Sequence, residues 1–264
     1  MRKATGNDLV AICSYLERDI ANCIYMYIDI GTYGLDNPNM EVWLEEENGS
    51  LTLVAMRYYN SLQVFSIGDS ADVRDVCELI RKHRFAIING RMALLERIQR
   101  NCEGYSLQPG QVYLCNGYLH REIPVVIEHA SYGDYAEIAA LLCADPVFAH
   151  YDPISLEHQL RERAATGMGR SRIIRVDGRI IAHIATFAEY RGLAVTSGLV
   201  VDPNYRNFPY GTILESELFR ELMEEGKQVY TFVLERKRGL LLKTMGCSLI
   251  ADYGKMVPIK QTLN

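Results

Sequence analysis

Apolar and polar residues along the second half of the chain form a regular series of helices and strands. Apolar residues that recur at a period of about 3.6 indicate helices, and a period of about 2 or a continuously apolar run indicates strands. The predicted elements are a strand at 125–130, helices at 134–143 and 156–166, strands at 172–176, 179–187 and 195–201, a helix at 211–225, a strand at 229–234, a helix at 236–245 and the last strands within 248–258. This order predicts a mixed α/β domain.

The first half repeats that order. Its predicted elements are a strand at 3–5, a helical region at 9–30, strands at 42–45, 51–58 and 62–67, a helix at 73–83, a strand at 85–88 and a helix at 92–101. The pairs Asn48-Gly49 and Asp177-Gly178 occupy matching places in the two series, and both are typical of two-residue β-hairpin turns. We interpret the repeat as an internal duplication that gives two tandem domains, over residues 1–118 and 122–264.

Composition and charge narrow the class of protein. With 264 residues and 48% apolar content, the chain has enough material for two cores. A net charge of −5 and a pI near 5.7 argue against nucleic acid as a partner. No apolar run reaches membrane-spanning length and no signal-peptide core follows the start, so we expect a cytoplasmic protein without a membrane partner. The oligomeric state is left open.

Cysteine and histidine spacing predicts no metal site. The seven cysteines are scattered without a C-x-x-C pair, and we expect reduced thiols. The six histidines lack the spacing of zinc ligands. Neither a G-x-S-x-G motif nor a G-x-x-x-x-G-K-[ST] motif occurs, which disfavours a serine hydrolase or a nucleoside triphosphatase.

The segment L-V-V-D-P-N-Y-R-N-F-P-Y-G-T at 199–212 runs from a strand through a loop into a long amphipathic helix. The first backbone N–H groups of a helix have no partner within it, and the helix dipole is positive at that end. This arrangement predicts a site for a phosphate or a pyrophosphate. Arg206 would add a fixed positive charge.

With its element order and the spacing from Arg206 to Gly211, this segment resembles the R-x-x-G-x-G site for acyl-coenzyme A in the GNAT superfamily of N-acetyltransferases. The resemblance covers about 122–264. With the repeated element order, it implies two tandem GNAT-like domains, each a mixed, mostly antiparallel twisted sheet flanked by helices. It departs from the motif at Pro209, which replaces the middle glycine and has no N–H to donate. The resemblance therefore implies that the pyrophosphate of acetyl-coenzyme A, the expected co-substrate, is held by the backbone of Asn207, Phe208, Tyr210, Gly211 and Thr212 beside Arg206. It also implies that the strand residues Leu199, Val200 and Val201 pair with the pantetheine arm beside the strand at 229–234.

The implied reaction is acyl transfer to an amine of a small molecule or a peptide, by direct attack on the thioester in a ternary complex. The family's frequent base and acid align with Val195 and Leu242, which are both apolar. Ser197 and Glu235 are the polar candidates that we select, Ser197 to hold a water together with Thr196 and Glu235 to accept a proton. Ser197 has the alternative role of filling a gap in the sheet, and Glu235 of capping a helix.

Further polar candidates are Tyr253 on a late strand and Glu189 with Tyr190 near a turn. The basic run at 236–238 is explained by a solvated helix face or by a contact with the 3′-phosphate of the coenzyme. The first domain carries Asp69 and Asp72 at its corresponding helix start, where carboxylates cap free N–H groups and repel a pyrophosphate. We therefore expect the first domain to pack against and shape the acceptor site rather than to bind coenzyme.

The alternative function is a non-catalytic acyl-coenzyme A binding or regulatory module with the same fold. Pro209 and the apolar residues at 195 and 242 favour it. An interaction scaffold that binds no coenzyme is a third hypothesis.

Overall fold

Two units make up the part of the chain that the computed structural model describes, residues 1–119 and 125–259. The first unit comprises Met1–Val112 and Ile250–Asn264, and the second comprises Tyr113–Leu249. The last strand therefore belongs largely to the first unit, although the sequence groups it with the second domain. It does so because it pairs antiparallel with a strand of the first unit, from Tyr253 opposite Arg91 to Met256 opposite Ile88.

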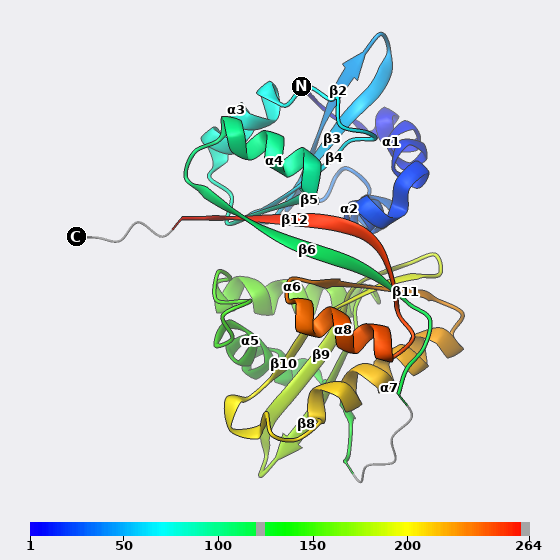
Figure 1. Cartoon of the computed structure of the whole chain (residues 1–264), viewed down its shortest axis with the longest axis vertical. Coiled ribbons are helices and arrows are strands. Elements are labelled where there is room, and N and C mark those ends of the chain that lie inside the picture. Colours follow the sequence, from blue (N-terminus) through cyan, green and yellow to red (C-terminus); the bar gives the residue numbers. More distant parts are fainter. Residues whose placement is uncertain (120–124, 260–264) are drawn as a thin grey trace, which may run out of the picture. The chain divides into compact units, whose positions relative to one another are not determined.

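The sheet of the first unit has the strand order β1-β2-β3-β4-β5-β12-β6. Its strands are β1 (Arg2–Lys3), β2 (Met40–Glu47), β3 (Ser50–Tyr58), β4 (Ser61–Phe65), β5 (Ile87–Arg91), β6 (Tyr105–Cys115) and β12 (Ser248–Pro258). The helices are α1 (Leu9–Leu16), α2 (Ile20–Tyr33), α3 (Arg74–His83) and α4 (Met92–Asn101), with 3₁₀ turns at Gly6–Asp8 and Glu17–Asp19. Helices α1 and α2 lie on one face of this sheet and α3 and α4 on the other (Figure 1).

The sheet of the second unit has the order β11-β10-β9-β8-β7. Its strands are β7 (Glu128–His129), β8 (Ser171–Val176), β9 (Arg179–Tyr190), β10 (Leu193–Val201) and β11 (Gln228–Val233). The helices are α5 (Tyr135–Cys143), α6 (Pro153–Ala165), α7 (Tyr210–Glu224) and α8 (Arg236–Thr244), with 3₁₀ turns at Tyr132–Asp134 and Pro203–Tyr205. Among the described strand pairs of this sheet, β10 and β11 are parallel, and the other pairs are antiparallel.

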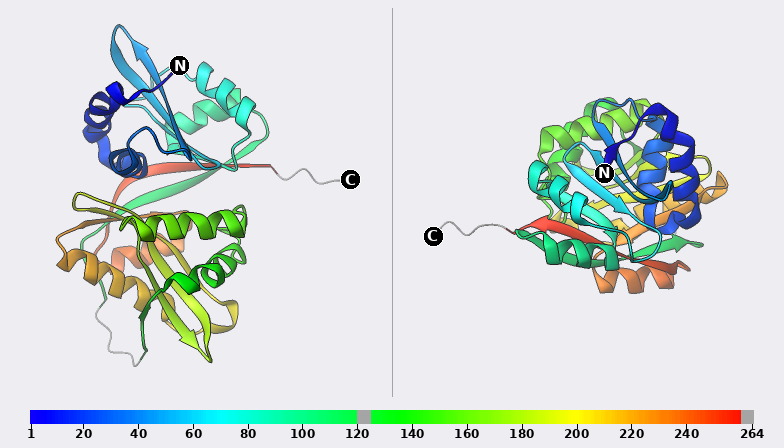
Figure 2. Two further views of the ribbon diagram at one scale, coloured as in Figure 1. Left: turned by 180° about the vertical axis from the view of Figure 1, so that it is seen from behind. Right: turned by 90° about the horizontal axis from the view of Figure 1, so that it is seen from above.

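Two apolar layers cover the two faces of the sheet of the second unit. Helix α7 contributes to one layer, and α5 and α6 contribute to the other (Figure 2). On one face, Leu214 and Phe219 of α7 pack with Ile174 and Val229, all fully or almost fully buried. The opposite layer consists of residues from α5, α6 and the sheet: Ile138, Leu142, Leu160, Ile173, Ile180 and Val200. Each fully buried side chain of this size contributes about 1.5–3 kcal/mol to stability, so the two layers fix the position of β9 and β10.

The predicted fold class is confirmed: both sheets are mixed, mostly antiparallel and flanked by helices. The predicted hairpin at Asp177-Gly178 is present, with φ values of 49° and 79° that suit its turn type. The helix predicted at 92–101 is α4. Strand β6 was missed, because Gln108-Pro109-Gly110 in its middle reads as a turn. No helix in the described residues is long and apolar enough to cross a membrane.

Candidate active site

Strands β10 and β11 separate part-way along their length. Their parallel pairing runs from Leu193 opposite Gln228 to Thr196 opposite Thr231, whereas both strands continue beyond those residues. At the point of separation, the buried Thr196 donates from Oγ1 to the carbonyl of Tyr230 at 3.4 Å. Backbone groups that lose their ladder partner need another one. The fork that follows Thr196 and Thr231 thus offers an open strand edge to a ligand.

A β-bulge shapes the other edge of β10 at the same level. Ser197 lies opposite Ala185 and Val200 opposite His183, so β10 has one extra residue between these two pairs. Gly198 adopts φ 69°, a left-handed conformation that glycine takes without strain. Within the described strands, Gly198 and Leu199 have no paired residue on β9 or β11. The regular register of the sheet is therefore interrupted at the peptide between Gly198 and Leu199.

The loop after β10 leads into the start of α7. The Asp202 carboxylate accepts from the Asn204 N–H at 2.9 Å and opens the turn. The N–H of Phe208 donates to the Tyr205 carbonyl at 3.1 Å. Helix α7 begins with Pro209 at its N-cap and without a side-chain cap. Among the described residues, no hydrogen bond is formed by the backbone N–H groups of Asn207, Tyr210, Gly211 and Thr212.

The Arg206 side chain folds back along its own loop. Its Nε donates to the Val201 carbonyl at 3.0 Å, and its Nη2 lies 3.0 Å from Oδ2 of Asp145 in the turn after α5. Arg206 remains half exposed. Next to it, Phe208 is 56% exposed and stacks on Tyr210 with 5.4 Å between ring centroids. The start of α7 is therefore bordered by a positive charge and a flat aromatic surface.

Comparison with known proteins agrees with this geometry. Residues 137–238, which include β8 to β11 and the loop, match the family model described as the acetyltransferase (GNAT) domain. This segment of the chain is similar to a GNAT acetyltransferase domain. No curated protein matches the sequence.

Solved structures share the fold of this chain over nearly its full length. A protein from Drosophila melanogaster has 13% identity and a TM-score of 0.72, with 99% of each chain covered. A GCN5-related N-acetyltransferase-like protein from Streptococcus suis has 12% identity and a TM-score of 0.69, with 97% of this chain and 100% of that chain covered. A tandem GNAT protein from the clavulanic acid biosynthesis pathway has 11% identity and a TM-score of 0.60, with 97% of each chain covered. At these identities the likeness concerns the fold.

The two selected catalytic candidates, Ser197 and Glu235, follow the paired parts of the forked strands. Ser197 is half-buried and comes directly after Thr196. Glu235 is exposed at the N-cap of α8, two residues after the end of β11, and its side chain makes no capping hydrogen bond. Both residues lie beyond the paired part of β10 and β11, on the side where the fork opens. Val195 and Leu242, which align with the family's frequent base and acid, are completely buried.

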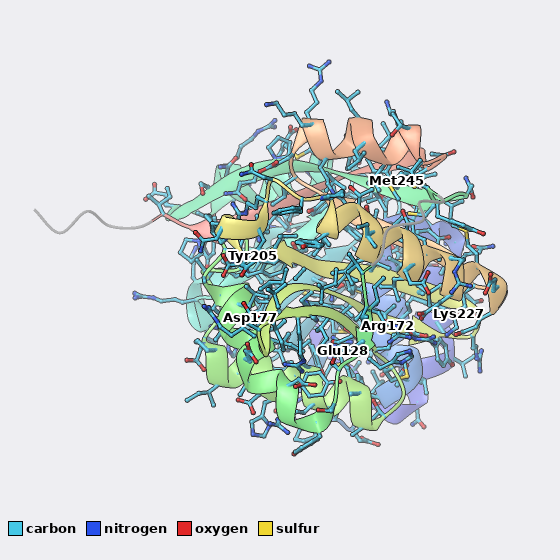
Figure 3. All side chains as sticks on the ribbon, turned by 90° about the horizontal axis from the view of Figure 1, so that it is seen from below. Glu128, Arg172, Asp177, Tyr205, Lys227 and Met245 are labelled. Carbon is cyan, nitrogen blue, oxygen red and sulfur yellow. The ribbon has the colours of Figure 1, made fainter. Side chains whose placement is uncertain are left out.

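Glu189 has a structural role in an ion-pair cluster. Its buried carboxylate accepts from both Nε and Nη2 of Arg170, from Thr186 at 2.5 Å, and from Lys227. Burial alone would raise the pKa of Glu189, but these donors outweigh it and hold the pKa below its ordinary value. The cluster is also remote from the loop: Lys227 precedes β11 and Tyr205 follows β10, at opposite ends of this sheet (Figure 3). A carboxylate so engaged is a weak base.

The other candidates also have partners or lie elsewhere. Tyr253 belongs to the first unit, where its ring lies against Gly110 and burial raises its pKa. In the basic run, Arg236 and Lys237 are exposed, but Arg238 forms an ion pair with the buried Glu215 of α7. The solvated-face explanation therefore does not extend to Arg238.

Sequence reasoning missed His183, which is fully buried on β9 beside the bulge. It stands in the run I-I-A-H-I-A, where a single polar residue among apolar ones carries no information about its partners. The seven cysteines are free. In residues 1–119 and 125–259, no group of three or more His, Cys, Asp or Glu side chains is placed to hold a metal ion.

Proposed function

We propose that the second unit transfers an acyl group from acyl-coenzyme A, with acetyl-coenzyme A as the expected donor, to an amine of a small molecule or a peptide. A GNAT domain supports acyl-coenzyme A-dependent N-acetyltransferase activity in general. The observation that carries the proposal is the fork between β10 and β11, which opens beside a helix start with unpaired N–H groups. This combination suits a ligand with a diphosphate at one end and a chain of amides at the other.

In this proposal the diphosphate accepts hydrogen bonds from the N–H groups of Asn207, Tyr210, Gly211 and Thr212. The N–H of Phe208 is taken by Tyr205 in the free protein, so Phe208 contributes its exposed ring instead. The pantetheine amides pair with the open edge of β10 at Leu199, Val200 and Val201, as an added strand pairs with a sheet edge. The thioester then reaches the level of the bulge.

Acyl transfer at this place requires one bond to form and one to break. The nitrogen lone pair of a neutral amine attacks the thioester carbon, the carbonyl oxygen becomes an oxyanion, and its collapse expels the thiolate. The amine loses a proton and the thiolate gains one. Ser197 holds the water that relays the proton from the amine to Glu235, and the exposed Glu235 returns the proton through solvent to the thiolate. Most of the rate comes from holding the two reactants together, because oriented reactants gain effective molarities of about 10⁵–10⁸ M.

Coenzyme binding is assigned to the second unit alone. In the first unit, Arg97 donates to the carbonyls of Asp69 and Ala71, and the Asp72 carboxylate accepts from the Arg74 N–H at 2.9 Å. The protein's own side chains thus occupy the segment before α3, and two carboxylates lie where a diphosphate would need donors. These contacts support the expectation that the first unit binds no coenzyme.

Two measurements on the full chain test the proposal. Calorimetric titration with coenzyme A should show one site per chain, and acetyl-coenzyme A with a panel of small and peptide amines should release free thiol. Binding without thiol release with any amine would favour the non-catalytic alternative, to which the buried apolar residues Val195 and Leu242 point. If coenzyme A does not bind, both the acyl transfer proposal and the non-catalytic alternative are wrong.

A further inference from the structure

The buried imidazole of His183 contacts the bulge of β10 directly. Its Nδ1 lies 2.8 Å from the carbonyl oxygen of Gly198, and its Nε2 lies 3.1 Å from Oγ of Ser171. A carbonyl oxygen only accepts, so Nδ1 carries the proton and Nε2 accepts from the Ser171 hydroxyl. Burial lowers the pKa of His183 to about 4, and the ring is neutral above that pH. The contacts therefore select one tautomer of an uncharged ring.

This contact orients the peptide between Gly198 and Leu199. His183 lies opposite Ile173 and Val200, which pack toward α5 and α6, so the Gly198 carbonyl is held toward that side of the sheet. In a planar trans peptide the C=O and the following N–H point in opposite directions. The N–H of Leu199 is therefore directed away from His183. A Cβ on Gly198 would lie 3.1 Å from Cε1 of His183, which shows how closely the ring and the bulge are packed.

We propose that His183 is a positioning residue for acyl transfer, which holds the Gly198 carbonyl so that the N–H of Leu199 is aimed at the thioester oxygen. The inference rests on the proposed function, because the N–H of Leu199 can act on a thioester only if the second unit binds acyl-coenzyme A. An oxyanion is stabilised best by a donor that is fixed before the reaction begins. Gly198 by itself does not fix the peptide, since glycine rotates more freely than any other residue. His183 removes that freedom.

Two substitutions of His183 distinguish a positioning role of this residue from a role in packing alone. Asn places its amide nitrogen near the site of Nδ1 and keeps a donor for the Gly198 carbonyl, whereas Gln places its amide near Nε2 and leaves that carbonyl without its donor. We expect H183Q to lower kcat by about 10²-fold, the effect of losing one oxyanion donor, with a much smaller change in KM for acetyl-coenzyme A. H183N should recover most of that loss. A residue that only fills space would give the two variants equal kcat per folded molecule.

Ser171→Ala is the matched control. It removes the partner of Nε2 but leaves the Nδ1 contact intact, so it should lower the melting temperature and keep kcat within about threefold. Spectra of ¹⁵N-labelled wild-type protein give a readout that does not depend on the folding of any variant. They should show the Nδ1–H tautomer of His183 and a shift of the Leu199 amide signal when acetyl-coenzyme A is added.

The outcomes distinguish this inference from the proposed function. If the wild-type protein releases thiol while H183Q keeps the wild-type kcat, the positioning role is wrong and the proposed function stands. An Nε2–H tautomer, or a Leu199 amide unaffected by acetyl-coenzyme A, also overturns the positioning role. If the wild-type protein neither binds coenzyme A nor releases thiol, both fail together.

Discussion

Arg206 and Asp145 form an ion pair that ties the loop after β10 to the turn after α5, with 3.0 Å between Nη2 and Oδ2. Asp145 is largely buried, and its other oxygen accepts from the Val147 N–H at 2.9 Å. The sequence predicts Arg206 as a direct partner of the diphosphate. In the structure its charge is partly compensated before any anion binds, so Asp145 and a diphosphate compete for the same guanidinium.

Replacing Asp145 with Asn should therefore tighten coenzyme A binding. The variant keeps an acceptor for the Val147 N–H but releases Arg206, and we expect Kd to fall about threefold, since surface charge pairs are worth about 0.2–1 kcal/mol. Arg206→Ala should raise Kd by a similar factor. Calorimetry at low and at high salt measures both, and added salt should shrink both effects. Weaker binding in Asp145→Asn would show instead that the pair acts as a unit to shape the loop.

A carboxylate in the first turn of α7 should weaken coenzyme binding without weakening the fold. Thr212→Glu puts a negative charge at the positive end of the helix dipole, which stabilises the helix by about 0.3–1 kcal/mol but repels a diphosphate. We expect Kd for coenzyme A to rise at least about tenfold while the melting temperature is kept or raised. Thr212→Gln is the control of equal size. If the two variants bind coenzyme A equally well, the diphosphate does not lie at this helix start.

Much of the fold was predictable because the strong signals are local. Helix α4 shows its apolar face at the helical period over its whole length, and Asp177-Gly178 suits its turn by residue type alone. Strand β6 is different. Its apolar alternation is interrupted by Pro109 and Gly110, and it is made a strand by pairing with β12, which is more than a hundred residues away in the sequence.

The candidate site likewise has one part that the local sequence predicts and another that it does not. The strand, loop and helix around Arg206 could be predicted, because each follows from its neighbours in sequence. The fork at Thr196 and Thr231 and the contact of His183 with Gly198 could not, since they depend on the register between strands. A polar residue inside an apolar strand signals a buried hydrogen bond but does not name its partner.

The buried pair of Glu215 and Arg238 joins α7 to α8. Replacing only one of the two residues should lower the free energy of unfolding strongly. Glu215 is 1% exposed, burial raises its pKa, and its Oε2 has no hydrogen-bond partner among the described residues. Arg238→Ala should lower the free energy of unfolding by about 3–5 kcal/mol, because it leaves a carboxylate buried without its counter-charge. The double variant Glu215→Leu with Arg238→Met should lose far less. Urea unfolding of the wild-type protein and both variants checks this, and a double variant that loses as much as Arg238→Ala would contradict the pairing.

The cluster around Glu189 should make stability depend on pH in acid. The donors on Arg170 and Lys227 hold the folded-state pKa of Glu189 below its ordinary value of 4.5, and the hydrogen bond from Arg170 lowers the pKa of the neighbouring Glu225 to about 2. A lowered pKa means that the unfolded chain takes up protons first, so the stabilisation is present above pH 4.5 and is lost as the pH falls through the folded-state pKa.

Glu189→Gln should therefore cost about 3–5 kcal/mol at neutral pH, as expected for a broken buried pair, and progressively less below pH 4.5. Glu224→Gln, which removes an exposed partner of Arg220, should cost less than about 1 kcal/mol. Urea unfolding at a series of pH values decides the matter: a loss in Glu189→Gln that stays constant into acid would mean that this carboxylate is not held ionised by its neighbours.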